Sequence, residues 1–334
     1  MRKIDKNKID SFYENIDNKR IAVVGDIMVD IYFWGKTNRI SPEAPVPVVD
    51  IYKEEIKPGG AANVALNIKS LGAKAIMFGI IGSDRTGEEL LESFKNMGID
   101  SRGIVVSSCR STTTKARVLA AGQHVVRYDK EIKDYIDKDL EDMLIDRFRE
   151  SIDSIDAVII EDYNKGVLTP RVIREVIAIS REKNKIIAID PKFDNIDCYE
   201  GATIFKPNLK EAEVILNKTI ETDSDIEKAG LEIISRLKIE YLIITLSERG
   251  MALFTPENRM KIIPTKALKV ANVSGAGDTV IATLVTAFTG GLEFFDASTL
   301  ANYAASVVVE DLGIVPIAKE ALYNRLVQFN MIEA

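Results

Sequence analysis

The residues best suited to chemistry lie near the C-terminus, where a glycine-rich loop meets an apolar segment. The loop is Asn272-Val-Ser-Gly-Ala-Gly-Asp-Thr279, and Val280 to Phe288 follow it directly. A loop that opens onto a helix N-terminus gathers unpaired backbone N–H groups and about half a positive charge. Gly275 and Gly277 allow positive φ and leave room for a ligand close to the backbone. This pattern indicates a site for a phosphate or a developing phosphoryl anion.

Asp278 lies beside this anion site, where its carboxylate could accept a proton from an attacking hydroxyl group. The loop would then stabilise charge while the acid activates the nucleophile. A purely structural role is the alternative, because an acidic residue in the first turn stabilises a helix by roughly 0.3–1 kcal/mol. Short glycine motifs also recur by chance. The rest of the chain has to decide between these interpretations.

Composition favours a small-molecule ligand. The chain has 334 residues, 46% hydrophobic and 28% charged, which is enough for one large domain or two modest ones. A net charge of −7 and a pI near 5.2 give no support to nucleic-acid or anionic-membrane binding. Cys109 and Cys198 form no C-x-x-C pair, and no apolar run approaches the length of a membrane span. We expect a cytoplasmic protein.

Short apolar runs that end in polar residues recur along the chain, with segments of helical period between them. This alternation predicts an α/β fold with a mostly parallel sheet and helices on both faces. Ligands of such folds bind outside the carboxyl ends of the strands. Singly, each polar residue there is more easily explained as a solvated loop residue. The runs are residues 21–25, 157–160, 185–189, 203–205 and 241–245, with helical segments such as 88–97, 170–183 and 224–237.

Two regions rich in β-branched and aromatic residues, 31–57 and 104–128, break this alternation. We predict that they form a small β lid inserted into the α/β body. A lid would exclude water from a phosphoryl-transfer site, and its exposed apolar face could also pair with another subunit. Residues 1–20 are predicted to be a polar helical extension, which leaves residues 21–334 as the main domain.

Two further segments suit ligand binding at the start of a helix. Gly59 and Gly60 precede Asn63, so a ligand hydroxyl could approach bare backbone and bond to the amide; tight helix packing through small residues is the alternative. Asn208 and Glu211 could hold a hydrated Mg²⁺ and nucleotide phosphates, although they also fit a capping box. The single histidine, His124, is predicted to be a surface or lid residue. Without a histidine ligand, a metal would be a hard, oxygen-bound ion such as Mg²⁺.

Together these motifs resemble those of the ribokinase-like (PfkB-type) carbohydrate kinases. Gly59 to Ala65, with Gly72 and Gly82, looks like the family's N-terminal signature, and Asn272 to Asp278 looks like its C-terminal one. The resemblance runs from about residue 20 to the end. Within the family it is closest to the D-glycero-β-D-manno-heptose 7-phosphate kinase group, on residues 24–30, 39–47, 58–65, 162–166, 190–192, 207–208 and 275–279.

The resemblance implies that Asp278 deprotonates a sugar hydroxyl and that the amides of Gly275, Ala276 and Gly277 form an anion hole. It also implies ATP and Mg²⁺ as cofactors and a homodimer formed through the β lid. The implied nucleotide and metal site comprises Asn208, Leu209, Lys210, Glu211, Ser247 and Gly250, with Glu211 reaching the metal through water. Sugar hydroxyls would be bound by Asp26, Asp30, Gly59, Gly60 and Asn63. Candidates for a sugar phosphate are Arg39, Arg117, Lys165 and Lys192.

The resulting hypothesis is phosphorylation of the anomeric hydroxyl of D-glycero-β-D-manno-heptose 7-phosphate to the 1,7-bisphosphate, on the route to ADP-heptose. The family usually has Asp where this chain has Asn272, and an amide keeps hydrogen bonding but loses a charge. Some group members carry a fused nucleotidyltransferase domain. The chain ends too early to hold one, so we expect a separate enzyme for the next step.

Three alternatives remain open. The nearest is another sugar kinase of the same family, acting on ribose, fructose or a hexose phosphate, because it would share every glycine motif. A second is a nucleotide or sugar sensor without turnover, motivated by Asn272. A third is a dinucleotide-dependent oxidoreductase, which would need G-x-G-x-x-G after the first strand; residues 25–30 lack it.

Overall fold

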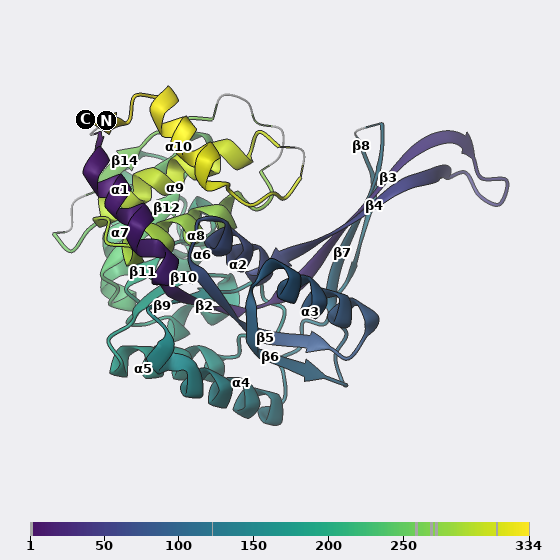
Figure 1. The fold of residues 1–334 in the computed structure, drawn as a ribbon, viewed down its shortest axis with the longest axis horizontal. Helices are drawn as coiled ribbons and strands as arrows, with labels where there is room; N and C mark the ends of the chain where they lie inside the picture. The colour runs from purple at the N-terminus through teal and green to yellow at the C-terminus, as the bar shows by residue number, and fades with distance from the viewer. Residues whose placement is uncertain are drawn as a thin grey trace.

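The protein is built around a nine-stranded sheet with the order β14-β13-β12-β11-β10-β9-β2-β5-β6 (Figure 1). The computed structural model describes residues 3–121, 123–257, 260–267, 270, 273–311 and 313–333. The strands are β2 (Arg20–Gly25), β5 (Lys74–Gly82), β6 (Asp100–Ser107), β9 (Ala157–Glu161), β10 (Ile186–Asp190), β11 (Ile204–Phe205), β12 (Tyr241–Thr245), β13 (Met251–Phe254) and β14 (Met260–Ile263).

The sheet is mostly parallel, as the sequence predicts. Every neighbouring pair from β6 across to β12 is parallel, whereas β13 and β14 continue the sheet as antiparallel strands. The five predicted strands are confirmed as β2, β9, β10, β11 and β12, which lie side by side. Their carboxyl ends therefore meet at one edge, where their terminal polar residues are brought together.

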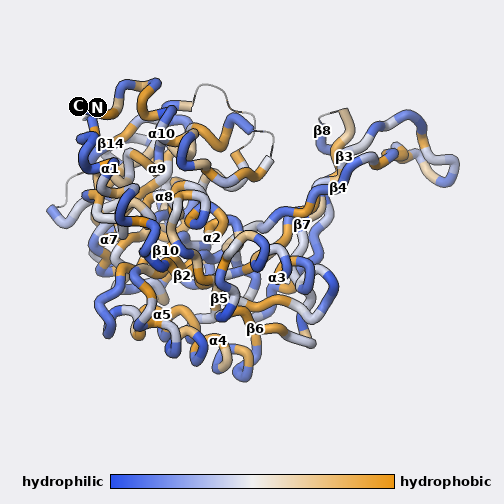
Figure 2. The backbone as a smooth tube through the Cα atoms, viewed as in Figure 1, coloured by the Kyte–Doolittle hydropathy of each residue, from blue (hydrophilic) through white to orange (hydrophobic). Residues whose placement is uncertain are grey.

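Helices cover both faces of the sheet. Along β2, Ile21 and Val23 join the core on one face while Ala22 and Val24 join the core on the other, so residues 21–24 are apolar on both faces. Figure 2 shows hydrophobic and hydrophilic stretches alternating along the outer helices α4 and α5, as expected of helices that bury one side. Among the described residues, no helix is both long and apolar enough to cross a membrane.

The two helical layers draw on different parts of the chain. The first core contains residues of α1 (Lys6–Asn15), α2 (Ala61–Ser70), α3 (Arg85–Met97), α8 (Ala276–Thr289), α9 (Phe294–Val308) and α10 (Lys319–Gln328). The second core contains residues of α4 (Lys138–Ser151), α5 (Pro170–Glu182), α6 (Leu209–Leu216) and α7 (Asp223–Leu237).

The N-terminal segment packs onto the main body. Helix α1 buries Ile9 and Phe12, which lie one helical turn apart, and Ile16 just after the helix is also buried. Before it, β1 (Ile4–Asp5) pairs in parallel with β15 (Ile332–Glu333). The two chain ends consequently lie side by side (Figure 1).

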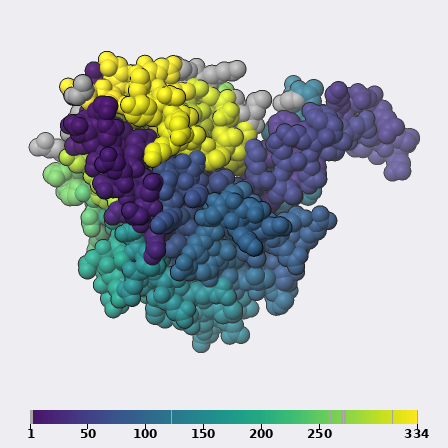
Figure 3. Space-filling view, in the orientation of Figure 1, coloured from purple at the N-terminus to yellow at the C-terminus, as the bar shows by residue number. Residues whose placement is uncertain are grey.

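A second, four-stranded sheet has the order β4-β3-β7-β8. Its long hairpin, β3 (Ile27–Ile40) and β4 (Pro47–Gly60), reaches far out from the body (Figure 3). The inner half of β3 is buried, whereas residues 36–40 are exposed. The other two strands are β7 (Thr113–Ala120) and β8 (Gln123–Lys130). We call these four strands the lid sheet.

One part of the predicted lid region lies elsewhere. Residues 104–106 belong to β6 and pair with β5 in the main sheet, so the expectation that they form part of the lid is wrong. Ile104 and Val105 are buried while Val106 is 49% exposed, as expected at a sheet edge. A β-branched run has the same composition in an edge strand as in a lid strand, so composition alone cannot separate the two.

Candidate active site

Asp278 lies in the first turn of α8, with only 5% of its surface exposed. Gly275 precedes the helix with φ of 79°, a left-handed conformation that glycine adopts without strain. Both carboxylate oxygens of Asp278 accept hydrogen bonds. Asn63 Nδ2 donates to Oδ2 at 2.7 Å, and the Tyr163 hydroxyl donates to Oδ1 at 2.6 Å. The two donors fix the carboxylate between α2 and the loop after β9.

A second asparagine orients the first. Asn67, one turn along α2, donates to the Asn63 side-chain oxygen at 3.3 Å and accepts from the Thr279 hydroxyl at 3.3 Å. Its oxygen also accepts the Ile317 backbone N–H at 2.9 Å. Because Asn63 Oδ1 is thus engaged by a donor, its Nδ2 is the group turned to Asp278. Buried amides on α2 and the start of α8 form one connected network.

The environment of Asp278 makes its carboxylate a better proton acceptor. Burial raises the pKa of Asp278 above its ordinary value, while the hydrogen bonds from Tyr163 and Asn63 act to lower it. Nearby Asp190 raises this pKa further, and Lys206 opposes that effect. A base whose pKa approaches the working pH accepts a proton more readily than an exposed aspartate does.

Next to Asp278, acidic residues and a lysine meet at the carboxyl ends of β9, β10 and β11. Lys206 is buried and pairs with Asp190 at 2.7 Å. Glu161 is buried, its Oε2 has no hydrogen-bond partner among the described residues, and burial with Asp190 and Asp278 raises its pKa well above the ordinary value. A Cβ at Gly277 would lie 3.6 Å from Lys206 Nζ. A cation thus lies beside the start of α8.

A cavity of about 540 Å³ lies at the α8 N-terminus. Its lining includes Ser247 and Gly250, two of the residues predicted to bind nucleotide, and also Ala276 and Gly277 from the predicted anion hole. The Ala276 N–H donates to the Val273 carbonyl at 3.3 Å, a long hydrogen bond. Asn272, at the head of the glycine motif, lies outside the described residues.

The segment Asn208 to Glu211 begins α6 with a complete capping box, so the alternative interpretation of Asn208 and Glu211 as helix-capping residues is confirmed. Asn208 also bridges to Thr245, which lines the cavity. Glu211 is buried and pairs with Lys192. Leu209 packs against the core, whereas Lys210 is exposed. The side chains of Leu209 and Lys210 therefore do not line the cavity beside the α8 N-terminus.

A metal ion at this edge would have to be held mainly by other groups. Among the described residues, no cluster of three or more acidic, histidine or cysteine side chains could hold a metal. The Glu211 carboxylate is already engaged by Lys192 and by the Asn208 backbone N–H at 2.8 Å. This donor set fits an ion such as Mg²⁺ bound through phosphate oxygens and water, with Glu211 as an indirect partner.

Asp26, which follows β2, is buried and holds the loop after β9. Its carboxylate accepts the backbone N–H groups of Tyr163, Lys165 and Val167 at 2.9, 3.0 and 3.2 Å. Burial and the neighbouring Asp162 raise the pKa of Asp26 to about 6, against the effect of those three donors. Asp26 therefore anchors residues 163–167, a structural task that its position after a strand did not reveal.

Asp30 and Gly59 meet closely between β3 and β4. A Cβ at Gly59 would lie 2.1 Å from Asp30 Oδ2, and a Cβ at Gly60, where φ is 55°, would lie 2.7 Å from the Asp26 carbonyl. Asp30 is buried and forms an ion pair with Arg117 of β7. The paired glycines thus make room for the two aspartates that follow β2.

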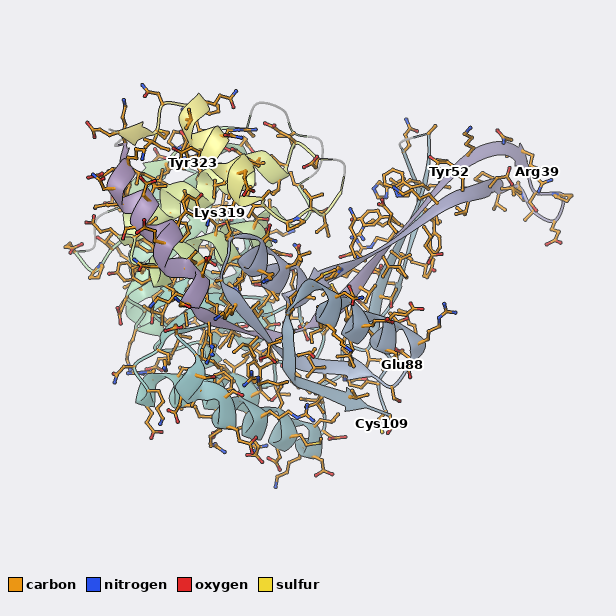
Figure 4. The ribbon with its side chains drawn as sticks, viewed as in Figure 1. Arg39, Tyr52, Glu88, Cys109, Lys319 and Tyr323 are labelled. Carbon is orange, nitrogen blue, oxygen red and sulfur yellow. The ribbon has the colours of Figure 1, made fainter. Side chains whose placement is uncertain are left out.

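The predicted sugar-phosphate cations do not all converge. Arg39 is exposed near the outer end of the β3–β4 hairpin (Figure 4), far from helix α8, which carries Asp278 (Figure 1). Lys165 pairs with Glu131 at 2.8 Å, and Lys192 pairs with Glu211. Arg117 lies in the lid sheet beside Asp30. Three of the four cations surround the site, and all three already have an acidic partner.

Lys115 is a site residue that the sequence analysis missed. Its Nζ lies 5.4 Å from the centre of the Tyr163 ring. Asp30 and Asp129 attract its charge, but among the described residues neither forms an ion pair with it. Burial lowers its pKa. Its spacing from Arg117 could have revealed it, because residues two apart on a strand face the same side of the sheet.

Comparison with known proteins identifies the family. A model described as pfkB family carbohydrate kinase matches residues 18–320. The chain belongs to the pfkB family of carbohydrate kinases. It is therefore a sugar kinase, as its motifs indicate, and the ribokinase-like kinases use ATP.

Its relatives include longer, bifunctional proteins. The bifunctional protein HldE of Geobacter sulfurreducens is 40% identical over 323 residues, covering 97% of this kinase and 66% of that protein. The HldE of Helicobacter pylori (strain ATCC 700392) is 42% identical over 295 residues, covering 88% of this kinase and 64% of the relative. This kinase thus spans slightly less than two thirds of the length of these relatives.

Solved structures confirm the ribokinase-like fold. Phosphofructokinase-2 of Escherichia coli in complex with fructose 6-phosphate matches with a TM-score of 0.77 and 16% identity, over 93% of this kinase and 99% of that chain. Ribokinase of Arabidopsis thaliana complexed with ribose and ATP matches with a TM-score of 0.71 and 19% identity, over 92% and 98%. At these identities the likeness concerns the fold alone.

Proposed function

We propose that this kinase transfers a phosphoryl group from ATP to the anomeric hydroxyl of D-glycero-β-D-manno-heptose 7-phosphate, in the synthesis of ADP-heptose. The observation that carries the proposal is the buried Asp278, held by Asn63 and Tyr163 at the start of α8, where Lys206 and a cavity of about 540 Å³ both adjoin Gly277. The identity to two HldE proteins over most of this chain supports the heptose phosphate as acceptor.

Asp278 acts as the general base. Its carboxylate takes the proton from the acceptor hydroxyl as that oxygen attacks the γ-phosphorus in line with the leaving ADP oxygen. The charge that spreads over the transferred phosphoryl group meets the backbone N–H groups of Gly275, Ala276 and Gly277. Lys206, the buried cation beside Gly277, adds positive charge at the same point.

The two substrates approach Asp278 from opposite sides. The nucleotide enters the 540 Å³ cavity, where Ser247 and Gly250 form part of the wall. Glu211 would hold a Mg²⁺ ion indirectly, through water, and that ion would supply positive charge to the phosphates. The sugar enters between Asn63 and the lid sheet, near Gly59, Gly60 and Asp30.

Lys115 and Arg117 bind the distal phosphate of the sugar, together with Lys165. Arg117 and Lys165 each have an acidic partner, so Lys115 supplies the one ammonium in this group that has none among the described residues. A half-buried cation without a counterion is costly unless a ligand supplies the negative charge. A sugar phosphate supplies it, whereas a plain sugar does not.

A substrate panel tests the acceptor. ADP release with ATP and Mg²⁺ is measured for D-glycero-D-manno-heptose 7-phosphate, fructose 6-phosphate, fructose and ribose. We expect rapid turnover with the heptose phosphate only. Turnover with another sugar would replace the substrate while keeping the kinase mechanism, and tight binding without ADP release would point to a sensor.

Replacing the base tests the mechanism. Asp278→Asn should lower turnover by about 10²–10⁴-fold, the usual contribution of a general base, with little change in melting temperature. Asp146→Asn makes the same change at an exposed position and should keep full activity. A folded Asp278→Asn enzyme with wild-type turnover would contradict the assignment.

Removing the unpaired cation tests the phosphate site. Lys115→Met should raise KM for the sugar phosphate by roughly 10–100-fold, the loss of one hydrogen bond to a charged group, and leave KM for ATP unchanged. The melting temperature without ligand should change little, because Asp30 and Asp129 attract the ammonium without forming an ion pair with it among the described residues. Lys130→Met, on exposed β8, is the control. An equal loss for a non-phosphorylated sugar would rule out the role.

The lid sheet also forms the interface of a homodimer in this proposal. It exposes a group of large apolar side chains, which mark interaction surfaces: Ile40, Ile51, Tyr52, Ile56 and Val126. Tyr52, 66% exposed, lies along the projecting hairpin (Figure 4). Among the described residues, the hydrophobic cores do not include these side chains, so their exposure needs another explanation.

Light scattering tests the dimer. The wild-type mass should be twice the 37.0 kDa of one chain, and Tyr52→Asp should shift the protein towards monomer because it introduces a charge into the apolar surface. Val214→Asp alters an exposed valine on α6, outside the lid sheet, and should leave the mass unchanged. A stable wild-type monomer would refute the proposed interface.

A further inference from the structure

Tyr163 contacts three parts of the site at once. Its hydroxyl donates to Asp278 Oδ1 at 2.6 Å. Its ring is approached by Lys115 Nζ at 5.4 Å and by Lys192 Nζ at 5.8 Å, both within the range of a cation–π interaction. Lys115 belongs to the lid sheet, and Lys192 pairs with Glu211 at the start of α6. No sequence motif used above assigns a role to this side chain.

The backbone that carries Tyr163 is tightly held. Asp26 accepts the N–H groups of residues 163, 165 and 167. Asn164 adopts a left-handed φ of 51°, and its N–H donates to Asp162 Oδ1 at 2.7 Å. A Cβ at Gly166 would lie 2.0 Å from the Asp134 carbonyl, so only glycine fits there. The hydroxyl of Tyr163 is therefore aimed by a rigid loop.

We propose that Tyr163 is a positioning residue, which fixes the Asp278 carboxylate through its hydroxyl and joins it to the lid sheet through Lys115. The inference rests on the proposed role of Asp278 as the general base. Lys115 binds the sugar phosphate in that scheme, so the ring under its ammonium lies next to the occupied acceptor site. Tyr163 thus places the base with respect to the sugar.

The charges around Asp278 give this role a measurable signature. Asp190 and Glu161 face Asp278 from β10 and β9, and Lys206 faces it after β11. Asn63 donates from α2, and Tyr163 donates from the loop after β9. A hydrogen bond that stabilises the ionised carboxylate opposes protonation. Without the Tyr163 hydroxyl, Asp278 takes up a proton at higher pH.

The experiment removes only the hydroxyl. Tyr163→Phe keeps the ring and both lysine contacts. The acid limb of the kcat/KM profile, which reports the free enzyme, should move to higher pH, so that kcat/KM on that limb falls roughly 10-fold or more. On the plateau at higher pH the loss should be much smaller. An Asp278→Asn enzyme, by contrast, should lose activity at every pH.

Tyr199→Phe is the matched control. The Tyr199 hydroxyl donates to Asp162 Oδ2 at 2.5 Å, so the same substitution removes another buried tyrosine-to-carboxylate hydrogen bond that does not touch Asp278. Its acid limb should match that of the wild type. An unmoved limb in Tyr163→Phe, or an equal movement in Tyr199→Phe, would overturn the proposal.

Two measurements keep the test decisive if activity or folding is poor. Site-specific 3-fluorotyrosine at position 163 is nearly isosteric and is a stronger donor, so it should move the acid limb to lower pH. Carbon-13 NMR of aspartate carboxyl groups, with Asp278 assigned through Asp278→Asn, follows protonation without sugar or nucleotide. A higher Asp278 pKa in Tyr163→Phe supports the contact whichever sugar is the substrate, and an unchanged pKa refutes it.

Discussion

The structure depends on keeping one carboxylate ionisable after it has been removed from water. An isolated carboxylate buried in an apolar site would simply stay protonated. Asp278 avoids this because Tyr163 and Asn63 donate to its two oxygens, and because the start of α8 and Lys206 supply positive charge nearby. Neither donor carries a full charge, so the carboxylate remains basic. A direct ion pair would have held it in place but lowered its affinity for a proton.

Close backbone approaches create the space for this arrangement. Gly59 and Gly60 let Asp30 and the Asp26 carbonyl lie where any Cβ would clash. Asp26 then directs the loop that carries Tyr163, and Asp30 pairs with Arg117 of the lid sheet. The glycines near residue 60 therefore act through the residues that they admit.

The sequence was sufficient for features that depend on local pattern. Five buried strands, the helix that begins after Gly275 and the glycine pair follow from runs and spacings within a few residues. Tyr163, Lys115 and Lys206 did not emerge, because their importance lies in contacts across the chain; Tyr163 meets a residue 115 positions away. Asp26 was placed correctly at a strand end, but a pattern cannot show that three backbone donors engage its oxygens. Arg39 was grouped with cations that it does not approach, since charge alone carries no distance.

The two sides of the site solve opposite electrostatic problems. The cavity at the start of α8 is largely apolar, with Glu248 as a charged residue in its wall, and in the proposed function it holds the flat base of the nucleotide with the phosphates at the helix start. On the proposed acceptor side, Asp30, Glu131 and Glu211 neutralise Arg117, Lys165 and Lys192, and among the described residues the ammonium of Lys115 has no ion-pair partner. If Lys115 also had an ion-pair partner, the empty site would be more stable, and a phosphate would gain less by binding there. In the proposed function, this lysine favours an anionic acceptor, and because it lies over the Tyr163 ring, it binds the acceptor next to Asp278.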